Sequence, residues 1–205
     1  MAVKIEKLVV GPLEVNCYLL STQGGPEALL VDPGDEASRI LARISVLGLE
    51  ISAVLLTHGH IDHWAALPDL QKKFQAPIFL HQDDHFLLEH RVNRDLAAMT
   101  GWECVSLPVS PLLAGPVSMA GIDFEIIHTP GHSPGSVVIR VDELLLTGDT
   151  LFAGGIGRSD LPGGNGKLLF ESLQQLRKMP AVTRIFPGHG EESDLSREAR
   201  FNPYW

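Results

Sequence analysis

The chain has 205 residues, of which 44% are hydrophobic and 20% charged, and its formal net charge is −9. Such a chain can bury one substantial core, so we expect a single domain over residues 1–205, although two small domains would also fit the length. The acidic balance argues against a nucleic-acid binder that relies on a broad basic surface.

The predicted elements of the first half are short apolar strands and helices with periodic apolar positions. Turn residues such as Gly11-Pro12 and Asp32-Pro33-Gly34 end two of the strands, and Gly48 ends the first helix. The strands are expected at 5–10, 17–21, 28–31, 53–56 and 78–81, and the helices at 35–47 and 64–74.

The second half repeats this order of strands and helix. We expect strands at 124–128, 136–141, 144–147 and 184–186, and an amphipathic helix at 167–179. Strands and helix in each half favour two sheets packed together with helices outside. A doubly wound sheet would also fit the pattern.

Residues 82–117 depart from this order. Residues 83–99 have a helical pattern, and the stretch that follows, through Pro116, is rich in proline and is expected to be irregular. We interpret 82–117 as an insertion lying near the functional site rather than as a separate domain.

Three features of the sequence indicate the cellular compartment of the protein: its N-terminus, the length of its apolar runs and its cysteine content. Charged residues interrupt the first apolar positions, unlike a signal peptide, and no apolar run approaches the ~18 residues of a membrane helix. Cys17 and Cys104 are too few for a disulfide scaffold, so we expect packed thiols. We therefore expect a cytoplasmic protein that binds neither membrane nor nucleic acid.

A dense histidine cluster follows the strand expected at 53–56. His58, His60 and His63 lie within six residues, together with Asp62. Polar side chains in such a run cannot all be buried without partners, because each unpaired group costs roughly 1–3 kcal/mol. A metal ion satisfies several of them at once, and imidazole and carboxylate are ligands that zinc, iron and manganese accept.

Three more candidate ligands stand beside glycines at the ends of later strands. They are His132, Asp149 and His189. Glycine allows the backbone to turn tightly at a strand end, so side chains from several strands can converge there. With the first cluster they make seven candidate ligands, a set that suits two ions sharing one carboxylate and one water.

The pattern His58-x-His60-x-Asp62-His63, followed by His132, Asp149 and His189, resembles the metallo-β-lactamase superfamily over nearly the whole chain. Residues 57–63, 129–136 and 147–152 resemble the glyoxalase II (hydroxyacylglutathione hydrolase) branch. Residues 154–164 resemble the short bacterial members of that branch, which have no C-terminal helical domain. The resemblance implies a four-layer αββα sandwich, with two mixed sheets packed together and helices outside.

The resemblance also implies how the ligands divide. One ion would take His58, His60 and His132, the other would take Asp62, His63 and His189, and Asp149 would bridge the two. The ions are divalent, with zinc favoured and iron or manganese as alternatives. A hydroxide bridging them would attack the carbonyl of a thioester, with Asp62 orienting it as a catalytic group.

The implied substrate is a small thioester of the S-lactoylglutathione type, held in part by Arg158. Arg158 fits a loop-bracing salt bridge as well as a substrate contact. The alternative function is an iron-dependent persulfide dioxygenase-like oxidoreductase, because residues 155–160 also resemble a loop of that enzyme, which uses one iron.

The remaining histidines and Asp32 carry weaker signals. Asp32 is interpreted as structural, with support of the metal ligands as the alternative. Ordinary structural or surface roles are expected for His81, His85, His90 and His128.

Overall fold

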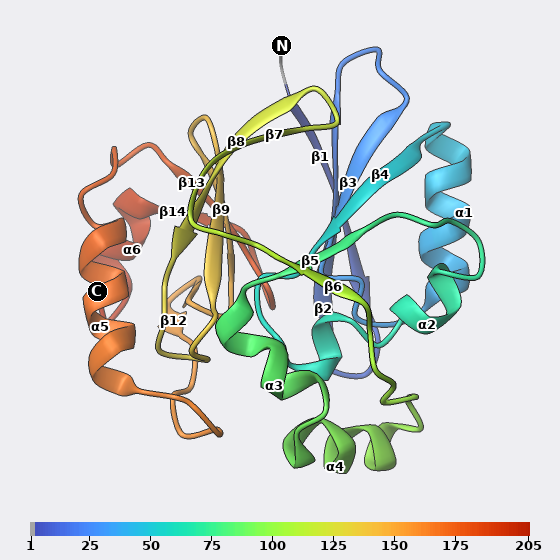
Figure 1. Cartoon of the computed structure of the whole chain (residues 1–205). Helices are drawn as coiled ribbons and strands as arrows, with labels where there is room; N and C mark the ends of the chain where they lie inside the picture. Colours follow the sequence, from blue (N-terminus) through green and yellow to red (C-terminus); the bar gives the residue numbers. More distant parts are fainter. Residues whose placement is uncertain (1–2) are drawn as a thin grey trace.

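The computed structural model describes residues 3–205 as two mixed β-sheets packed face to face, with helices on both outer sides (Figure 1). The first sheet has the order β1-β2-β3-β4-β5-β6. Its strands are β1 (Val3–Val10), β2 (Val15–Thr22), β3 (Glu27–Val31), β4 (Glu50–Leu55), β5 (Ile78–Leu80) and β6 (Val109–Pro111). The first three are antiparallel, and β3 to β6 are parallel.

The second sheet has the order β14-β13-β10-β9-β8-β7. Its strands are β7 (Gly115–Met119), β8 (Ile122–His128), β9 (Val137–Val141), β10 (Leu144–Gly148), β13 (Arg184–Pro187) and β14 (Ser193–Asp194). Only the β10–β13 pair in this sheet is parallel, so the carboxyl ends of these two strands lie side by side. A small hairpin, β11 (Leu151–Phe152) and β12 (Gly155–Ile156), follows β10.

Helices cover the two outer faces (Figure 1). On the side of the first sheet lie α1 (Ala37–Leu47) and α2 (Leu67–Leu70), and on the side of the second lie α5 (Gly166–Leu176) and α6 (Leu195–Phe201). Between β5 and β6 the chain forms α3 (His85–Leu88) and α4 (Arg91–Thr100). Within residues 3–205, no helix has the length and apolar character needed to cross a membrane.

Three apolar clusters lie between these four layers, and β2 shows how the sequence builds them. Cys17 and Leu19 pack with the helices of the first sheet, whereas Tyr18 and Leu20 pack between the sheets. The alternation follows from the two-residue period of a strand. A third cluster, containing Leu173 of α5, covers the outer face of the second sheet. The predicted αββα sandwich is therefore confirmed, and the doubly wound alternative is wrong.

Two predicted helices differ from the structure. The helix expected at 64–74 is α-helical only over Leu67–Leu70. Pro68 lies in its first turn, the part of a helix that tolerates a residue without an amide hydrogen. The helix expected at 83–99 is divided into α3 and α4, and the side chain of His90 accepts a hydrogen bond from Val92 N at the start of α4.

The stretch expected to be irregular contains regular structure. Residues 109–111 form β6, and residues 115–119 form β7, so the predicted insertion supplies an edge strand to each sheet. These strands are short, and three prolines and a glycine lie in or beside them, which hid them from a pattern of alternating apolar residues. The strand β14 and helix α6 were also not predicted; Asp194 caps α6 by accepting from Arg197 N.

Candidate metal centre

The histidine cluster occupies the loop that follows β4. β4 is a buried parallel strand, and the loop leaves its carboxyl end through Leu56 and Thr57 into the short 3-10 turn at Ile61–His63. The four predicted ligands in this loop are all buried, with exposed fractions of 1% for His58, 6% for His60, 9% for Asp62 and 0% for His63. The loop therefore places four metal-binding side chains inside the protein.

The other three predicted ligands come from the second sheet and reach the same place. His132 lies in the turn between β8 and β9, Asp149 follows β10 directly, and His189 follows β13. Because β10 and β13 are parallel neighbours, Asp149 and His189 leave the sheet at the same edge. All seven side chains predicted from the sequence are thus brought together.

The seven side chains fall into two groups joined by Asp149. His58, His60 and His132 have ligand atoms within 4.8 Å of one another, and so do Asp62, His63 and His189. We call these the first and second half-sites. Asp149 Oδ2 lies 3.7 Å from Nε2 of His132 and 3.7 Å from Nε2 of His189. The carboxylate therefore lies between the half-sites, as the predicted bridging role requires.

Four of the five rings are held through Nδ1 and turn Nε2 toward the centre. His63 Nδ1 donates to Asp32 Oδ2 at 3.0 Å, and His58 Nδ1 donates to Thr57 Oγ1 at 3.1 Å. The rings of His132 and His189 donate to backbone carbonyls, those of Arg158 at 2.8 Å and Leu13 at 2.9 Å. This pattern fixes the tautomer that leaves an Nε2 lone pair for a metal ion.

Several buried atoms in the centre have no hydrogen-bond partner among the described residues. They include Nε2 of His58, Nε2 of His63 and Oδ1 of Asp149. Leaving such groups unpaired costs roughly 1–3 kcal/mol each, so a stable fold needs something to satisfy them. Imidazole nitrogens and a carboxylate around one point are the donor set of zinc, iron and manganese. The residues therefore fit a pair of divalent ions.

The two half-sites differ in charge: burial lowers the pKa of the His58 and His60 rings, whereas nearby carboxylates raise the pKa of His63 and His189 against the effect of burial. Burial lowers the pKa of His60 to about 4 and that of His58 well below its usual value, so both rings are neutral at pH 7 and can donate lone pairs. Burial opposes ionisation of Asp149, but the charge and hydrogen bond of His63, together with the rings of His58 and His132, outweigh it and lower the pKa of that carboxyl. The pKa of Asp62 is lowered in the same way, against burial, by His63 and His189.

Asp32 was expected to be structural, with support of the ligands as the alternative, and the structure shows it in contact with a ligand. Its carboxylate is 1% exposed, accepts from His63 Nδ1, and also accepts from Thr57 N at 2.8 Å and Thr57 Oγ1 at 2.7 Å. Asn93 was missed by sequence reasoning. It accepts from Ile61 N and donates to Gly59 O, so it holds the backbone of the histidine loop from α4.

Arg158 has the salt bridge that the sequence left open. Its guanidinium donates to both carboxylate oxygens of Asp160, each at 2.7 Å, on an exposed part of the loop. The backbone carbonyl of Arg158 is the acceptor for His132, which sequence reasoning did not predict. Contact between the Arg158 side chain and a substrate stays a prediction.

A further histidine group lies outside the centre. His81, Asp83 and His128 offer ligand atoms within 4.8 Å of one another. The two rings are stacked at 4.3 Å with only 12° between their planes. Ring lone pairs lie in the ring planes, so nearly parallel rings cannot both aim at one ion without rotating. His128 Nε2 moreover donates to Pro134 O at 2.8 Å, in keeping with a structural role.

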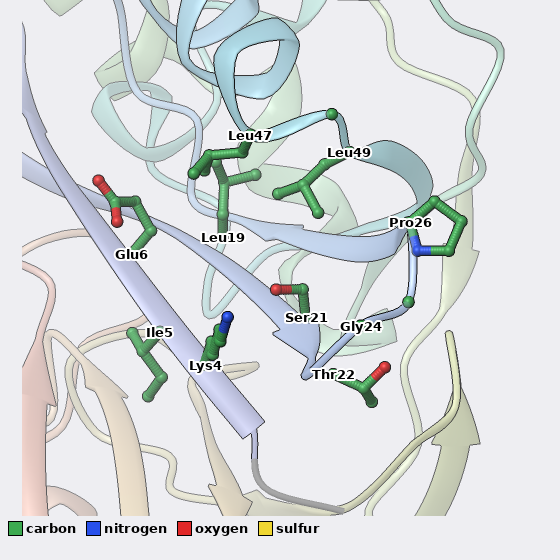
Figure 2. Close-up of a pocket in the computed structure, with 12 residues that line it drawn as sticks. Lys4, Ile5, Glu6, Leu19, Ser21, Thr22, Gly24, Pro26, Leu47 and Leu49 are labelled. Atoms are coloured by element: carbon green, nitrogen blue, oxygen red, sulfur yellow. The ribbon is translucent and has the colours of Figure 1, made fainter.

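A groove of about 630 Å³ lies elsewhere, between β1, β2 and the end of α1 (Figure 2). Leu19 and Leu49 are among its apolar residues, and Lys4 and Ser21 are among its polar ones. None of the seven predicted ligands lines it, so the chemistry indicated by the sequence is located away from this groove.

Two curated relatives align with almost the whole chain. A probable metallo-hydrolase, YqgX, from Bacillus subtilis is 36% identical over 206 residues, covering 98% of this chain and 97% of the relative. The hydroxyacylglutathione hydrolase GloC from Haemophilus influenzae is 33% identical over 213 residues, again covering 98% and 97%.

Three solved structures are also similar to this chain over nearly its whole length. A di-iron-bound form of TTHA1623 has a TM-score of 0.88 and 40% identity, and covers 98% of this chain and 100% of that protein. BLEG-1, described as a B3 metallo-beta-lactamase, has a TM-score of 0.90 and 32% identity, covering 98% and 99%. ETHE1 from Myxococcus xanthus has a TM-score of 0.79 and 26% identity, covering 98% and 83%.

The family model of the metallo-beta-lactamase superfamily matches residues 10–189. This range begins at Val10, the last residue of β1, and ends at His189, so it includes strands β2 to β13 and all seven predicted ligands. Together with the αββα sandwich and the His/Asp centre, the match shows that this chain belongs to the metallo-beta-lactamase superfamily.

Proposed function

We propose that this protein is a dinuclear metal-dependent hydrolase of thioesters, acting on glutathione conjugates of the S-lactoylglutathione type. The observation that carries the proposal is the position of the Asp149 carboxylate, 3.7 Å from a ring nitrogen of each half-site. A carboxylate between two complete half-sites suits two ions rather than one. The similarity to the hydroxyacylglutathione hydrolase GloC supports the choice of substrate.

The substrate reaches the centre on the side of the second half-site. The His189 side chain is 27% exposed, whereas those of His63 and His132 are 0% and 3% exposed. The Phe152 ring lies 6.2 Å from the His189 ring, centroid to centroid, and provides an apolar surface at this opening. Arg158, on an exposed loop, is the proposed cation for a substrate carboxylate.

Asp62 is the proposed catalytic carboxylate. Its Oδ2 lies 3.5 Å from His189 Nε2, on the open side of the centre, and its lowered pKa keeps it ionised at pH 7. Two bound ions would lower the pKa of a shared water and polarise the acyl carbonyl. Asp62 can orient that water and accept its proton while the C–O bond forms. The C–S bond then breaks, and the thiolate leaves without needing a strong general acid.

The experiment combines metal analysis with a lactoylglutathione assay on one purified sample. We expect two equivalents of metal per chain and loss of the thioester absorbance, with zinc favoured and iron or manganese as alternatives, since the related TTHA1623 was solved with two irons. Nitrocefin belongs in the same assay because BLEG-1 is described as a metallo-beta-lactamase. A fully loaded sample that hydrolyses none of several thioesters would contradict the proposal.

A second candidate function is an iron-dependent persulfide dioxygenase-like activity. The similarity to ETHE1 and the resemblance of residues 155–160 to a loop of that enzyme favour it. Metal count and oxygen uptake separate the two candidates. One tightly held iron with oxygen consumption on a glutathione persulfide would replace the hydrolase proposal.

A further inference from the structure

Asp84 is a fully buried carboxylate outside the set of metal ligands. It ends the 3-10 turn Gln82–Asp84 that follows β5, and it is 0% exposed. Its Oδ2 accepts hydrogen bonds from Gly59 N at 2.9 Å and from Ser133 Oγ at 2.6 Å. Its Oδ1 accepts from Gly135 N at 2.6 Å. Three donors thus meet on one side chain.

The three donors belong to the two loops that carry the first half-site. Gly59 lies between His58 and His60, and Ser133 follows His132 directly. The first loop comes from the first sheet and the second loop from the second sheet, so Asp84 links the sheets at the point where these rings meet. His60 Nδ1 and His132 Nε2 are 2.9 Å apart across this link.

The second half-site has different supports. Asp32 holds the His63 ring, and Asn16 Nδ2 donates to the carbonyls of Pro187 and Gly190 on either side of His189. Within residues 3–205, the hydrogen bonds of the Asp84 side chain go to none of these groups. A change at Asp84 is therefore expected to disturb one half-site and spare the other.

Only a carboxylate satisfies this arrangement. Each oxygen of Asp84 faces a backbone N–H, and a backbone N–H cannot reverse its role. An asparagine would turn its NH₂ toward either Gly59 N or Gly135 N, so one pair of donors would face each other. Gly135 also approaches the carboxylate so closely that a Cβ built on it would lie 2.8 Å from Asp84 Cγ.

The geometry points to Asp84 as a positioning residue that fixes the first half-site and determines whether its ion is held. Asp84 touches neither ion nor substrate; it acts through the backbone beside His58, His60 and His132. The consequence is an Asp84→Asn protein that holds one ion tightly, in the second half-site. This inference rests on metal binding by the seven ligands, and not on the identity of the thioester.

The test is a Co²⁺ titration of metal-free protein, followed by its visible absorption and by a competing chromophoric chelator. The unaltered chain is expected to take two equivalents. Asp84→Asn is expected to take one with unchanged affinity and to bind the other 10- to 100-fold more weakly, the usual loss when a support of a ligand is removed. In the double variant Asp84→Asn with His60→Ala, the ion of the second half-site should keep its affinity, since both changes act on the first half-site.

Asp83→Asn is the matched control. It removes the same charge from the neighbouring residue in the same turn, but the Asp83 side chain is 47% exposed and lies 3.8 Å from His81 rather than beside a ligand loop. This variant should bind two ions as the unaltered chain does. Ser133→Ala keeps the Asp84 carboxylate and removes one of its three donors, so it should weaken the same ion by a smaller factor even if Asp84→Asn does not fold.

The inference is wrong if the folded Asp84→Asn protein binds both ions with unchanged affinity. It is also wrong if both ions are weakened equally, because that result would indicate a general loss of structure rather than a local one. Circular dichroism of the metal-free variants shows which of them fold. The titration needs no substrate, so its outcome is separate from the test of thioester hydrolysis.

Discussion

Replacing Asp32 by asparagine tests how the second half-site is prepared for its ion. Asp32 has a positive φ of 48°, a backbone conformation that asparagine tolerates well, so the change isolates the side chain. Its two oxygens accept from His63 Nδ1, Thr57 Oγ1 and Thr57 N. In the variant, the Thr57 amide will keep the one remaining side-chain oxygen facing it, so the new NH₂ group will face His63.

An NH₂ beside His63 Nδ1 favours the tautomer in which Nδ1 accepts and Nε2 carries the proton. Nε2 is the atom that points to the centre, so the ring loses the lone pair that an ion needs. Loss of such a support weakens metal binding by about 10- to 100-fold, or about 1.4–2.7 kcal/mol. The mismatched hydrogen bonds also destabilise the metal-free fold by roughly 1–3 kcal/mol.

The assay is a titration of metal-free Asp32→Asn protein against a chromophoric chelator, with urea unfolding of the same sample. We expect the ion of the second half-site to weaken more than that of the first, whose His58 reaches Asp32 only through the Thr57 hydroxyl. Asp69→Asn, at an exposed carboxylate whose side chain is 69% accessible, should change neither. Unchanged affinity for both ions in Asp32→Asn would refute the role given to the His63 tautomer.

Three further predictions concern the centre. Asp149→Ala removes the carboxylate between the half-sites and should cost at least one ion and nearly all activity; normal metal content would refute the bridging position. Gly157→Ala places a Cβ 1.8 Å from Asp149 O and 3.3 Å from His132 Cβ, so we expect reduced metal content and at least tenfold less activity, measured at matched protein concentration. In chelator-treated protein, burial holds the pKa of His60 at about 4 against the usual 6.5, so the unfolded chain binds a proton that the folded chain rejects. His60 should therefore remove about 3 kcal/mol of stability as the pH falls from 6.5 to 4. Urea unfolding at the two pH values should show this loss, and His60→Gln should show a smaller one; equal losses would contradict the assignment.

The sequence by itself determined the parts of this protein that depend on local order. The apolar run at 17–21 predicts the strand β2, and the seven candidate ligands follow from histidine and aspartate placed beside glycines at strand ends. Their pattern also indicated the superfamily that the family model then matched. Such features can be read from a sequence because the residues that define them are neighbours along the chain.

Only the tertiary structure decided which groups hold those ligands in place. Ser133 and Gly135 lie 49 and 51 residues from Asp84, and Asn16 lies 171 residues from the carbonyl that it binds. These pairs form where strands of two different sheets end at one edge, and no spacing in the sequence marks them. The strands β6 and β7 were likewise not marked in the sequence. Each is short and forms because it pairs with a neighbouring strand, β6 with β5 and β7 with β8. The ligand set and its expected division into two half-sites were therefore available from the sequence and its family resemblance, whereas the hydrogen bonds that support the ligands are properties of the fold.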